Sequence, residues 1–408
     1  MLRNILFISY DGMCDPLGQS QVIPYLTGLS ALGHRITIVS AEKPEAYRIL
    51  SAEISNQLSG SQISWQPVCF SHGLPGWSAW ENFWRLKSEA RKACIKSTID
   101  IVHCRSYISA LIGLQLKNRF HLKMIFDMRG FWADERVEGG LWNLRNPLYR
   151  FAYHFFKKKE KQFLLSSEAI VCLTESAREV LLSWKKLQLP ADHIFVIPCC
   201  ADLHLFTPKN PDPEKKAGLR KQLNIQKNDF ILSYSGSLGT WYLLNEMLEF
   251  FSMVLSKKPE AKFLFITHDI KEPIIASAAI FKIPPERIIV TGATRRQMPV
   301  MLSLSDISIF FIKNSFSKTA SSPTKMAEVM AMGIPVICNA GVGDVETIIS
   351  KTGTGICIPE LTTENFASAI SRLDSLLRIP PDKISDSARQ YFSLDVGIEK
   401  YNSIYQLL

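Results

Sequence analysis

Short apolar runs of strand length recur along this chain, and longer segments with helical character separate them. In the first half the runs lie at residues 4–9, 35–40, 100–104, 123–127, 168–173 and 194–198. In the second half they lie at residues 230–235, 262–267, 287–291, 306–311 and 334–338. Continuous apolar strands joined by helices are typical of parallel sheets that are covered on both faces. The pattern predicts an α/β fold with two doubly wound units.

The length of the chain also favours two domains, because 408 residues exceed what one compact core usually holds. With 47% apolar and 21% charged residues, the chain has the composition of a folded globular protein. Residues 207–216, TPKNPDPEKK, combine proline and charge as linkers do. We therefore expect domains at residues 1–206 and 207–387. Helical spacing of apolar residues from 394 to 408 predicts a final helix within residues 388–408.

The net charge of +9 implies attraction to something anionic, which leaves nucleic acid, an anionic membrane surface and a phosphorylated substrate as candidates. No apolar run approaches the roughly 18 residues that a membrane span requires. The first residues enter a strand rather than a signal peptide, so we expect a cytoplasmic protein. The nine cysteines include no Cys-x-x-Cys pair. Their placement predicts reduced thiols and no metal site.

Residues 319–346, TASSPTKMAEVMAMGIPVICNAGVGDVE, predict a helix followed by the strand at 334–338. Ser322 has the position of an N-cap, and Pro323 that of the first helical residue. Lys325 falls in the first turn, where the helix dipole favours an anion rather than a cation. Glu328 lies about 6 Å further along the axis from Thr324, on the same face, as a ribose lies from a phosphate. The alternative is an ordinary capped helix with an exposed lysine and a solvated glutamate.

Two loops follow predicted strands at the edge where open α/β sheets bind ligands. Residues 10–19, YDGMCDPLGQ, lead into a predicted helix at 19–32, and Gly12 and Gly18 permit close approach of the backbone. Residues 127–140, DMRGFWADERVEGG, bring several charges to the end of another strand. Charges crowded at such a place indicate a functional loop rather than a structural one.

Two longer patterns resemble a known family. Residues 323–337 read P-T-K-x-x-E-x-M-A-x-G-x-P-V-I, and residues 15–34 read D-P-L-G-Q-S-Q-V-x-P-Y-L-x-x-L-x-x-x-G-H. Both resemble the retaining glycosyltransferases of family 4, which have the GT-B fold of two Rossmann-like domains facing across a cleft. The resemblance implies sugar transfer from a nucleoside-diphosphate sugar, a UDP- or GDP-sugar, to a glycan or lipid-linked acceptor in cell-surface polysaccharide synthesis. It further implies no cofactor, no metal, and a final helix that packs back on the first domain.

The resemblance also implies roles for individual residues. Glu328 matches the glutamate that binds the donor ribose, the loop after residue 235 matches the pyrophosphate loop, and the turn at 291–294 matches the loop that reads the nucleobase. The donor-binding candidates are Gly18, Gly236, Ser237, Thr291, Gly292, Arg295, Ser322, Thr324, Lys325 and Glu328. The catalytic candidates are Asp127, Arg129 and Lys325, and the acceptor-side candidates are Asp11, Gly12, Asp134 and Glu135.

The chain departs from the family pattern at two places. Ala320 stands where most members have an acidic residue, and Ser237 with residues 241–242 stands where relatives have an arginine and a lysine. These departures leave two alternatives open. One is a nucleotide-sugar epimerase of the same fold, and the other is a non-catalytic GT-B module that partners an active synthase.

Two segments combine aromatic and basic residues. Residues 75–96 place Trp77, Trp80 and Trp84 at helical spacing among cations, and residues 151–161 read FAYHFFKKKEK. Such helices favour contact with an anionic membrane surface, and a core-packed helix with a solvated basic face is the alternative. Nucleic acid is not predicted as a partner, because no recognised binding signature accompanies the segments. We expect a protein peripheral to the inner face of the plasma membrane.

Overall fold

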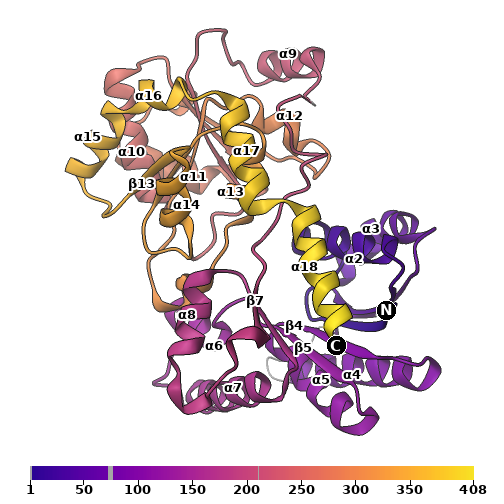
Figure 1. Ribbon diagram of the computed structural model, residues 1–408. Coiled ribbons are helices and arrows are strands. Elements are labelled where there is room, and N and C mark those ends of the chain that lie inside the picture. The colour runs from indigo at the N-terminus through magenta and orange to yellow at the C-terminus, as the bar shows by residue number, and fades with distance from the viewer. Residues whose placement is uncertain (1, 72–76, 210) are drawn as a thin grey trace. The chain divides into compact units, whose positions relative to one another are not determined.

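The computed structural model describes residues 2–71, 77–209 and 211–408. The chain forms two compact units, one made of Met1–Pro198 together with Leu394–Leu408, and the other of Cys199–Ser393. Each unit is a parallel sheet with connecting helices (Figure 1). Both units therefore have the doubly wound architecture that the alternation of apolar runs predicts.

In the described part of the first unit the sheet has seven strands in the order β3-β2-β1-β4-β5-β6-β7. The strands are β1 Asn4–Ser9, β2 Arg35–Glu42, β3 Ile63–Cys69, β4 Ile101–Arg105, β5 Lys123–Asp127, β6 Ala169–Cys172 and β7 Ile194–Val196. The helices are α1 Pro16–Gln21, α2 Ile23–Ala31, α3 Pro44–Leu58, α4 Trp77–Lys96, α5 Ser106–Phe120, α6 Trp132–Glu138, α7 Pro147–Ser166, α8 Glu175–Ser183 and α18 Leu394–Leu407, with 3-10 turns at Lys185–Leu187 and Ala191–His193.

Within the described residues of the second unit the sheet has six strands in the order β10-β9-β8-β11-β12-β13. The strands are β8 Ile231–Ser235, β9 Lys262–Ile266, β10 Ile288–Thr291, β11 Ile307–Phe310, β12 Val336–Asn339 and β13 Gly355–Ile358. The helices are α9 Pro213–Gln222, α10 Leu244–Lys257, α11 Lys271–Ile280, α12 Met298–Leu302, α13 Thr324–Ala331, α14 Val345–Thr352, α15 Thr363–Ser371, α16 Leu373–Leu377 and α17 Pro381–Phe392, with 3-10 turns at Pro285–Arg287 and Phe316–Ala320.

Burial of the central strands on both faces explains their composition. All five residues of β4 and all five of β8 are buried, so neither strand alternates between buried and exposed positions. In the second unit, aromatic rings fill the space between sheet and helices, and Phe263 and Phe265 lie with ring centroids 4.1 Å apart. The apolar runs thus mark the strands that hold the loops of the candidate site in place.

The structure differs from the sequence-based boundaries at three places. The predicted helix at 19–32 is two helices, because Val22 leaves the helical region at φ −125° and ψ −64°. Strands β3 and β13 were not predicted: β3 lies at a sheet edge with polar residues and Pro67, and β13 is only four residues long. The units divide after Pro198 rather than after residue 206, because Ala201 and Phe206 are buried in the core of the second unit.

The final helix also begins later than the predicted residue 388, because α17 ends at Phe392 and α18 starts at Leu394. Residues 388–392 belong to α17, which packs beside α13, whereas α18 belongs to the first unit and packs beside α2 (Figure 1). Tyr401 and Tyr405 of α18 are both buried there. No described helix is long and apolar enough to cross a membrane.

Candidate functional site

The start of α13 differs from the predicted cap. The helix begins at Thr324, and Pro323 occupies the N-cap position, where no side chain caps the helix. Ser322 instead accepts a hydrogen bond through its Oγ from the backbone N–H of Cys199, at 3.1 Å. Ser322 therefore anchors the beginning of the second unit, and the first turn of α13 is left without a side-chain cap.

Lys325 is neither exposed nor hydrogen-bonded. Its Nζ lies 3.8 Å from the ring centroid of Tyr234 and 3.5 Å from that of Tyr242. The side chain retains some exposure along its stem, but the Nζ atom is buried and has no hydrogen-bond partner among the described residues. Burial lowers the pKa of this ammonium group well below its usual range, and the carboxylates of Glu328 and Asp269 offset this only in part. A buried amine without a partner is costly, which is typical of a group that awaits a ligand.

Gly236 lies directly beside this amine. A Cβ built on Gly236 would come within 3.4 Å of the Lys325 Nζ, and the residue has φ +102°, which favours glycine. The loop that follows is held by Asp269, which accepts hydrogen bonds from the Leu238 N–H at 2.6 Å and the Ser237 hydroxyl at 3.3 Å. The structure thus brings Gly236, Ser237 and Lys325 together at the carboxyl end of β8.

Glu328 lies one turn further along α13 and is only 7% exposed. Its Oε1 pairs with the guanidinium of Arg295, which comes from the loop between β10 and α12. The same guanidinium lies over the ring of Phe206, 4.6 Å from its centroid. The glutamate predicted to bind ribose therefore already has an internal cationic partner.

The turn at 291–294 stands beside His268. A Cβ on Gly292 would lie 2.6 Å from His268 Nδ1, so a larger residue here would require the exposed His268 ring to move. Thr291 closes β10, and its hydroxyl lies 3.4 Å from the carbonyl oxygen of Gly292. Thr324 is half-buried at the first position of α13.

The loop after β1 is fixed by a residue that sequence reasoning missed. Glu42 is fully buried at the end of β2 and accepts the backbone N–H groups of Met13 at 2.7 Å and Cys14 at 3.1 Å. A Cβ on Gly12 would meet the Glu42 Oε2 at 2.6 Å, and one on Gly18 would meet the carbonyl oxygen of Gly12 at 2.1 Å. Both glycines are therefore required by close packing within this loop.

Asp127, at the end of β5, is 2% exposed and cannot reach solvent in this structure. Its Oδ2 accepts a hydrogen bond from the Tyr401 hydroxyl at 3.1 Å, and Arg129 Nη1 lies 3.8 Å from its Oδ1. Burial alone would raise the pKa of this carboxyl group, but Arg129, His103 and Arg105 outweigh burial and lower it. Arg129 itself has φ +58°, an uncommon backbone conformation for a residue other than glycine.

Arg105 lies between two of the predicted site residues of the first unit: it donates a hydrogen bond to Asp11, and its charge lowers the pKa of Asp127. It lies at the end of β4, and its Nε donates to Asp11 Oδ2 at 3.3 Å. Asp11, Asp127 and Arg129 are therefore grouped at the carboxyl ends of β1 and β5 with β4 between them.

Asp134 and Glu135 lie apart from that group, on α6. Asp134 accepts hydrogen bonds from Tyr153 at 2.9 Å and Lys157 at 2.8 Å, and these contacts join α6 to α7. Lys157 also pairs with the fully buried Glu160 at 2.6 Å. In this structure Asp134 links two helices, and Glu135 is half-buried beside it.

Two charged residues of the second unit, Lys318 and Asp269, lie near the candidate site but belong to no sequence motif. Lys318 is 6% exposed, and its Nζ lies 3.7 Å from the ring centroid of Trp241. Ala320, where the family pattern has an acid, is buried at 1% exposure. Asp269 and Lys318 were missed because neither belongs to a motif, and only the fold brings them to the loops after β8 and β11.

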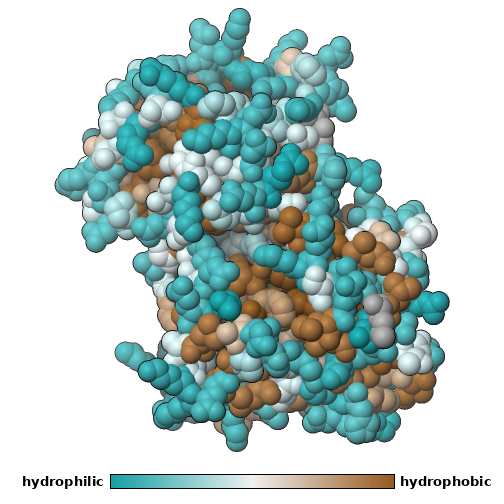
Figure 2. Space-filling model, in the orientation of Figure 1, coloured by the Kyte–Doolittle hydropathy of each residue, from teal (hydrophilic) through white to brown (hydrophobic). Residues whose placement is uncertain are grey.

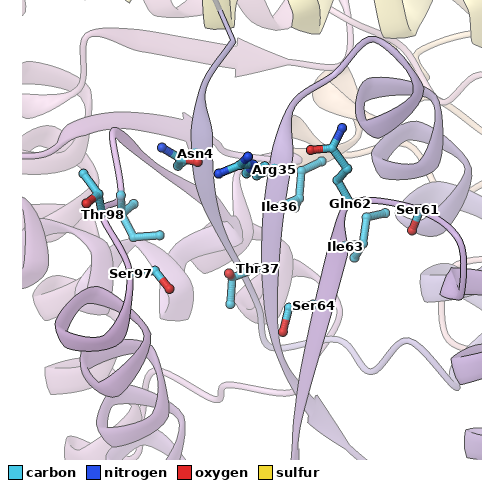
Figure 3. A pocket seen from close by; sticks show the side chains of 11 residues that line it. Asn4, Arg35, Ile36, Thr37, Ser61, Gln62, Ile63, Ser64, Ser97 and Thr98 are labelled. Atoms are coloured by element: carbon cyan, nitrogen blue, oxygen red, sulfur yellow. The ribbon is translucent and has the colours of Figure 1, made fainter.

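A cavity lies at the opposite end of the first sheet. It has a volume of about 580 Å³ and is lined by the first residues of β1, β2 and β3, among them Asn4, Arg35 and Ile63 (Figure 3). Parallel sheets bind ligands at the carboxyl ends of their strands. The cavity therefore does not coincide with the candidate residues.

Comparison with known proteins identifies related families for both halves. Residues 21–205 match the model described as Glycosyltransferase Family 4, and residues 215–390 match that of the glycosyl transferases group 1. An alpha-D-kanosaminyltransferase of Streptomyces kanamyceticus is 22% identical over 268 residues, which cover 65% of this chain and 63% of that relative. The match thus spans less than two thirds of the relative's length.

Solved structures resemble the whole chain. A glycosyltransferase from Rickettsia africae matches with a TM-score of 0.70 and 19% identity, covering 100% of this chain and 98% of the other. HepE of Anabaena, solved with UDP and glucose, matches with a TM-score of 0.69 and 12% identity, covering 100% of both chains. WaaG, described as a glycosyltransferase involved in lipopolysaccharide biosynthesis, has a TM-score of 0.67 and 14% identity, covering 98% and 99%. At these identities the likeness concerns the fold.

Proposed function

The chain belongs to the group 1 glycosyltransferases with the GT-B fold, and from this premise we propose that it transfers a sugar from a nucleoside-diphosphate sugar to a glycan or lipid-linked acceptor. The buried, unpartnered Nζ of Lys325 beside Gly236 carries the proposal. An amine that lies near the start of a helix without a hydrogen-bond partner is suited to a diphosphate, which can supply both the hydrogen bonds and the negative charge. UDP is the first nucleotide to test, since HepE was solved with UDP-glucose, and GDP is the second.

In this proposal the donor lies along α13. The diphosphate approaches the first turn of the helix, Gly236 lets the backbone come close, and Lys325 neutralises charge. Glu328, about 6 Å further along the axis, accepts the ribose hydroxyls. The turn with Thr291 and Gly292 contacts the nucleobase. The second unit would thus supply all the donor-binding candidates except Gly18, which belongs to α1 of the first unit.

The proposed reaction breaks the bond between the anomeric carbon and the diphosphate oxygen and forms a bond from that carbon to an acceptor oxygen. The acceptor hydroxyl loses its proton, and the departing diphosphate takes the electron pair. Stabilising that negative charge is the main task, for which Lys325 and the α13 amides are suited. We propose retention of the anomeric configuration and no role for a metal or a resident cofactor, as in the family resemblance.

The acceptor side of this proposal belongs to the first unit. Because Asp127 is buried beneath Arg129, we assign substrate contact to Arg129 and Asp11, which retain exposure, and support of Arg129 to Asp127. A role in cell-surface polysaccharide synthesis belongs to the same proposal. One structural neighbour, WaaG, is described as involved in lipopolysaccharide biosynthesis.

An anionic membrane surface is the proposed partner of α7. The outer face of this helix carries Leu148, Phe151 and Phe155, which are 76%, 72% and 38% exposed. Exposed cations flank them at Arg150, Lys158 and Lys161, and the one acid of the helix, Glu160, is fully buried. Apolar side chains between cations, with no exposed acid, are typical of helices that lie in a lipid interface.

The other segment, α4, is a weaker candidate. Trp80 and Trp84 are exposed, but Glu81 and Glu89 pair with Arg85 and Lys92 on the same helix, so its charges are partly neutralised. Residues 75 and 76, and the side chain of Trp77, lie outside the described residues. On the face in Figure 2, the first unit displays more hydrophobic side chains than the second. We therefore assign membrane contact to α7.

A thermal-shift screen tests the donor proposal. UDP, GDP, CDP, ADP and dTDP are added to the wild type, to Glu328→Ala and to a control, Glu346→Ala, which removes an exposed acid of α14. A nucleotide present at a hundred times its Kd should stabilise the folded chain by about 2.7 kcal/mol. We expect one nucleotide to raise the melting temperature of the wild type and the control but not of Glu328→Ala.

Other results point to the alternatives. An equal shift in Glu328→Ala would remove the ribose assignment. Silence of a folded wild type towards all five nucleotides would favour the non-catalytic module. Conversion of a nucleotide sugar to its epimer without any acceptor would favour the epimerase.

A further inference from the structure

In this structure Glu328, the carboxylate proposed to bind the ribose, forms an ion pair with Arg295. The Glu328 side chain is 9% exposed and that of Arg295 is 23% exposed, so water competes little for the pair. Both residues belong to the second unit, but they come from different elements: Glu328 from α13, and Arg295 from the loop before α12. The ion pair therefore joins the loop between β10 and α12 to helix α13.

The guanidinium is held from a second side as well. It lies 4.6 Å from the ring centroid of Phe206, which is fully buried in the core of the second unit. Stacking on an aromatic ring and pairing with a carboxylate are the two contacts that suit a planar guanidinium. Two contacts thus hold Arg295 at Glu328.

A carboxylate that accepts two ribose hydroxyls needs both of its oxygens, and one of them is engaged by Arg295. If Arg295 simply left, Glu328 would remain buried without a partner, which is strongly unfavourable. Ribose hydroxyls restore the lost hydrogen bonds when they enter at that carboxylate. A nucleotide that lacks one of these hydroxyls displaces the same guanidinium and restores less.

We propose that Arg295 is a built-in substitute for the nucleotide: it holds Glu328 while the site is empty, and the ribose hydroxyls displace it. The inference rests on the proposed function, because it takes Glu328 as the ribose ligand. It replaces the sequence-based prediction that Arg295 binds the donor. It also makes Arg295 a specificity-determining residue, since the exchange rewards ribonucleotides over 2′-deoxyribonucleotides.

If Arg295 is a donor ligand, Arg295→Gln should bind UDP more weakly. If it is displaced by the ribose, the same variant should bind UDP more tightly. Affinities of UDP and 2′-deoxy-UDP are measured by calorimetry for the wild type, Arg295→Gln and Glu328→Gln. Arg296→Gln serves as the control, because it removes an exposed cation from the same loop. If UDP displaces Arg295, Arg295→Gln should bind UDP about tenfold more tightly, which corresponds to one charge-assisted hydrogen bond no longer being broken. Glu328→Gln should bind UDP more weakly, and Arg296→Gln should behave as the loss of a surface charge.

Folding of the variants is checked by the melting temperature without ligand. Arg295→Gln should melt below the wild type, and UDP should recover most of the difference. If Arg295→Gln does not fold, Arg295→Lys takes its place, because lysine keeps the charge but makes a less specific contact. Its UDP affinity should also exceed that of the wild type.

Each outcome decides between the assignments. Weaker UDP binding by Arg295→Gln, with weaker binding also by Glu328→Gln, would make Arg295 a donor ligand and overturn the inference while leaving the proposed function intact. Unchanged UDP binding by Arg295→Gln and Arg295→Lys would overturn it as well. No binding of UDP or any other nucleoside diphosphate by the folded wild type would instead refute the proposed function.

Discussion

Lys325 shows how one residue can lower stability and still serve a site. Its amine is buried without a hydrogen bond, so replacing it with an apolar side chain of similar length removes an uncompensated polar group. We expect Lys325→Met to raise the free energy of unfolding at neutral pH by about 1–3 kcal/mol. The same variant should bind the nucleoside diphosphate more weakly, since the charge for the phosphates is lost. Chemical denaturation and calorimetry measure the two effects.

The stability advantage of Lys325→Met should depend on pH. The pKa of Lys325 lies well below its usual 10.5 in the folded chain, so the unfolded chain binds more protons at this residue between the two values. The free energy of unfolding of the wild type therefore rises with pH through that window. The advantage of Lys325→Met should shrink as the pH approaches 10.5. An advantage that is the same at neutral and alkaline pH would show that the amine is not neutral in the folded chain.

The sequence alone identified the loop glycines and the charged residues that belong to motifs. It did not identify the residues that hold those loops in place. Gly12, Gly18 and Gly236 stand in loops whose position after a strand is readable from apolar runs. Glu42 and Asp269, which fix those loops, are single acids at ordinary positions, and only the tertiary fold brings them there. The capping role of Ser322 was wrong because its hydroxyl has a more distant partner, Cys199.

At the scale of the element, α7 yields a prediction about surfaces. Phe151→Ser together with Phe155→Ser should weaken binding to vesicles that contain anionic lipid by at least about a hundredfold, because each buried phenylalanine contributes at least about 1.5 kcal/mol. Trp80→Ser with Trp84→Ser, on α4, is the matched control and should change binding little. Co-sedimentation with vesicles at several salt concentrations measures both.

Two outcomes of the vesicle experiment would contradict the assignment to α7. Loss of binding in the α4 variant alone would transfer the contact to α4. Absence of binding by the wild type to anionic vesicles would remove the membrane surface as a partner. The sequence predicted both helices but could not choose between them, because burial of Glu160 and the pairing of Glu81 and Glu89 depend on packing.

For the whole molecule, the two separate cores predict two unfolding events. Each unit has its own sheet and its own buried side chains, and all the donor-binding candidates except Gly18 lie in the second unit. In differential scanning calorimetry, UDP should therefore raise the melting temperature of one transition and leave the other unchanged. Asp127→Asn, which weakens a buried contact with Tyr401, should lower the other transition. A single transition that shifts as one under both changes would show that the units unfold together.

The position of α18 has a consequence for synthesis of the chain. The first unit needs Tyr401 and Tyr405 to cover His103 and Asp127, yet these tyrosines are synthesised only after the whole of the second unit. The second unit, which is continuous in sequence, can finish folding while the first still lacks one wall. During this interval the nascent first unit exposes apolar surface that chaperones recognise. A message cut short just after the second unit would yield a protein with an intact second unit and an open first one, which is a substrate for proteolysis.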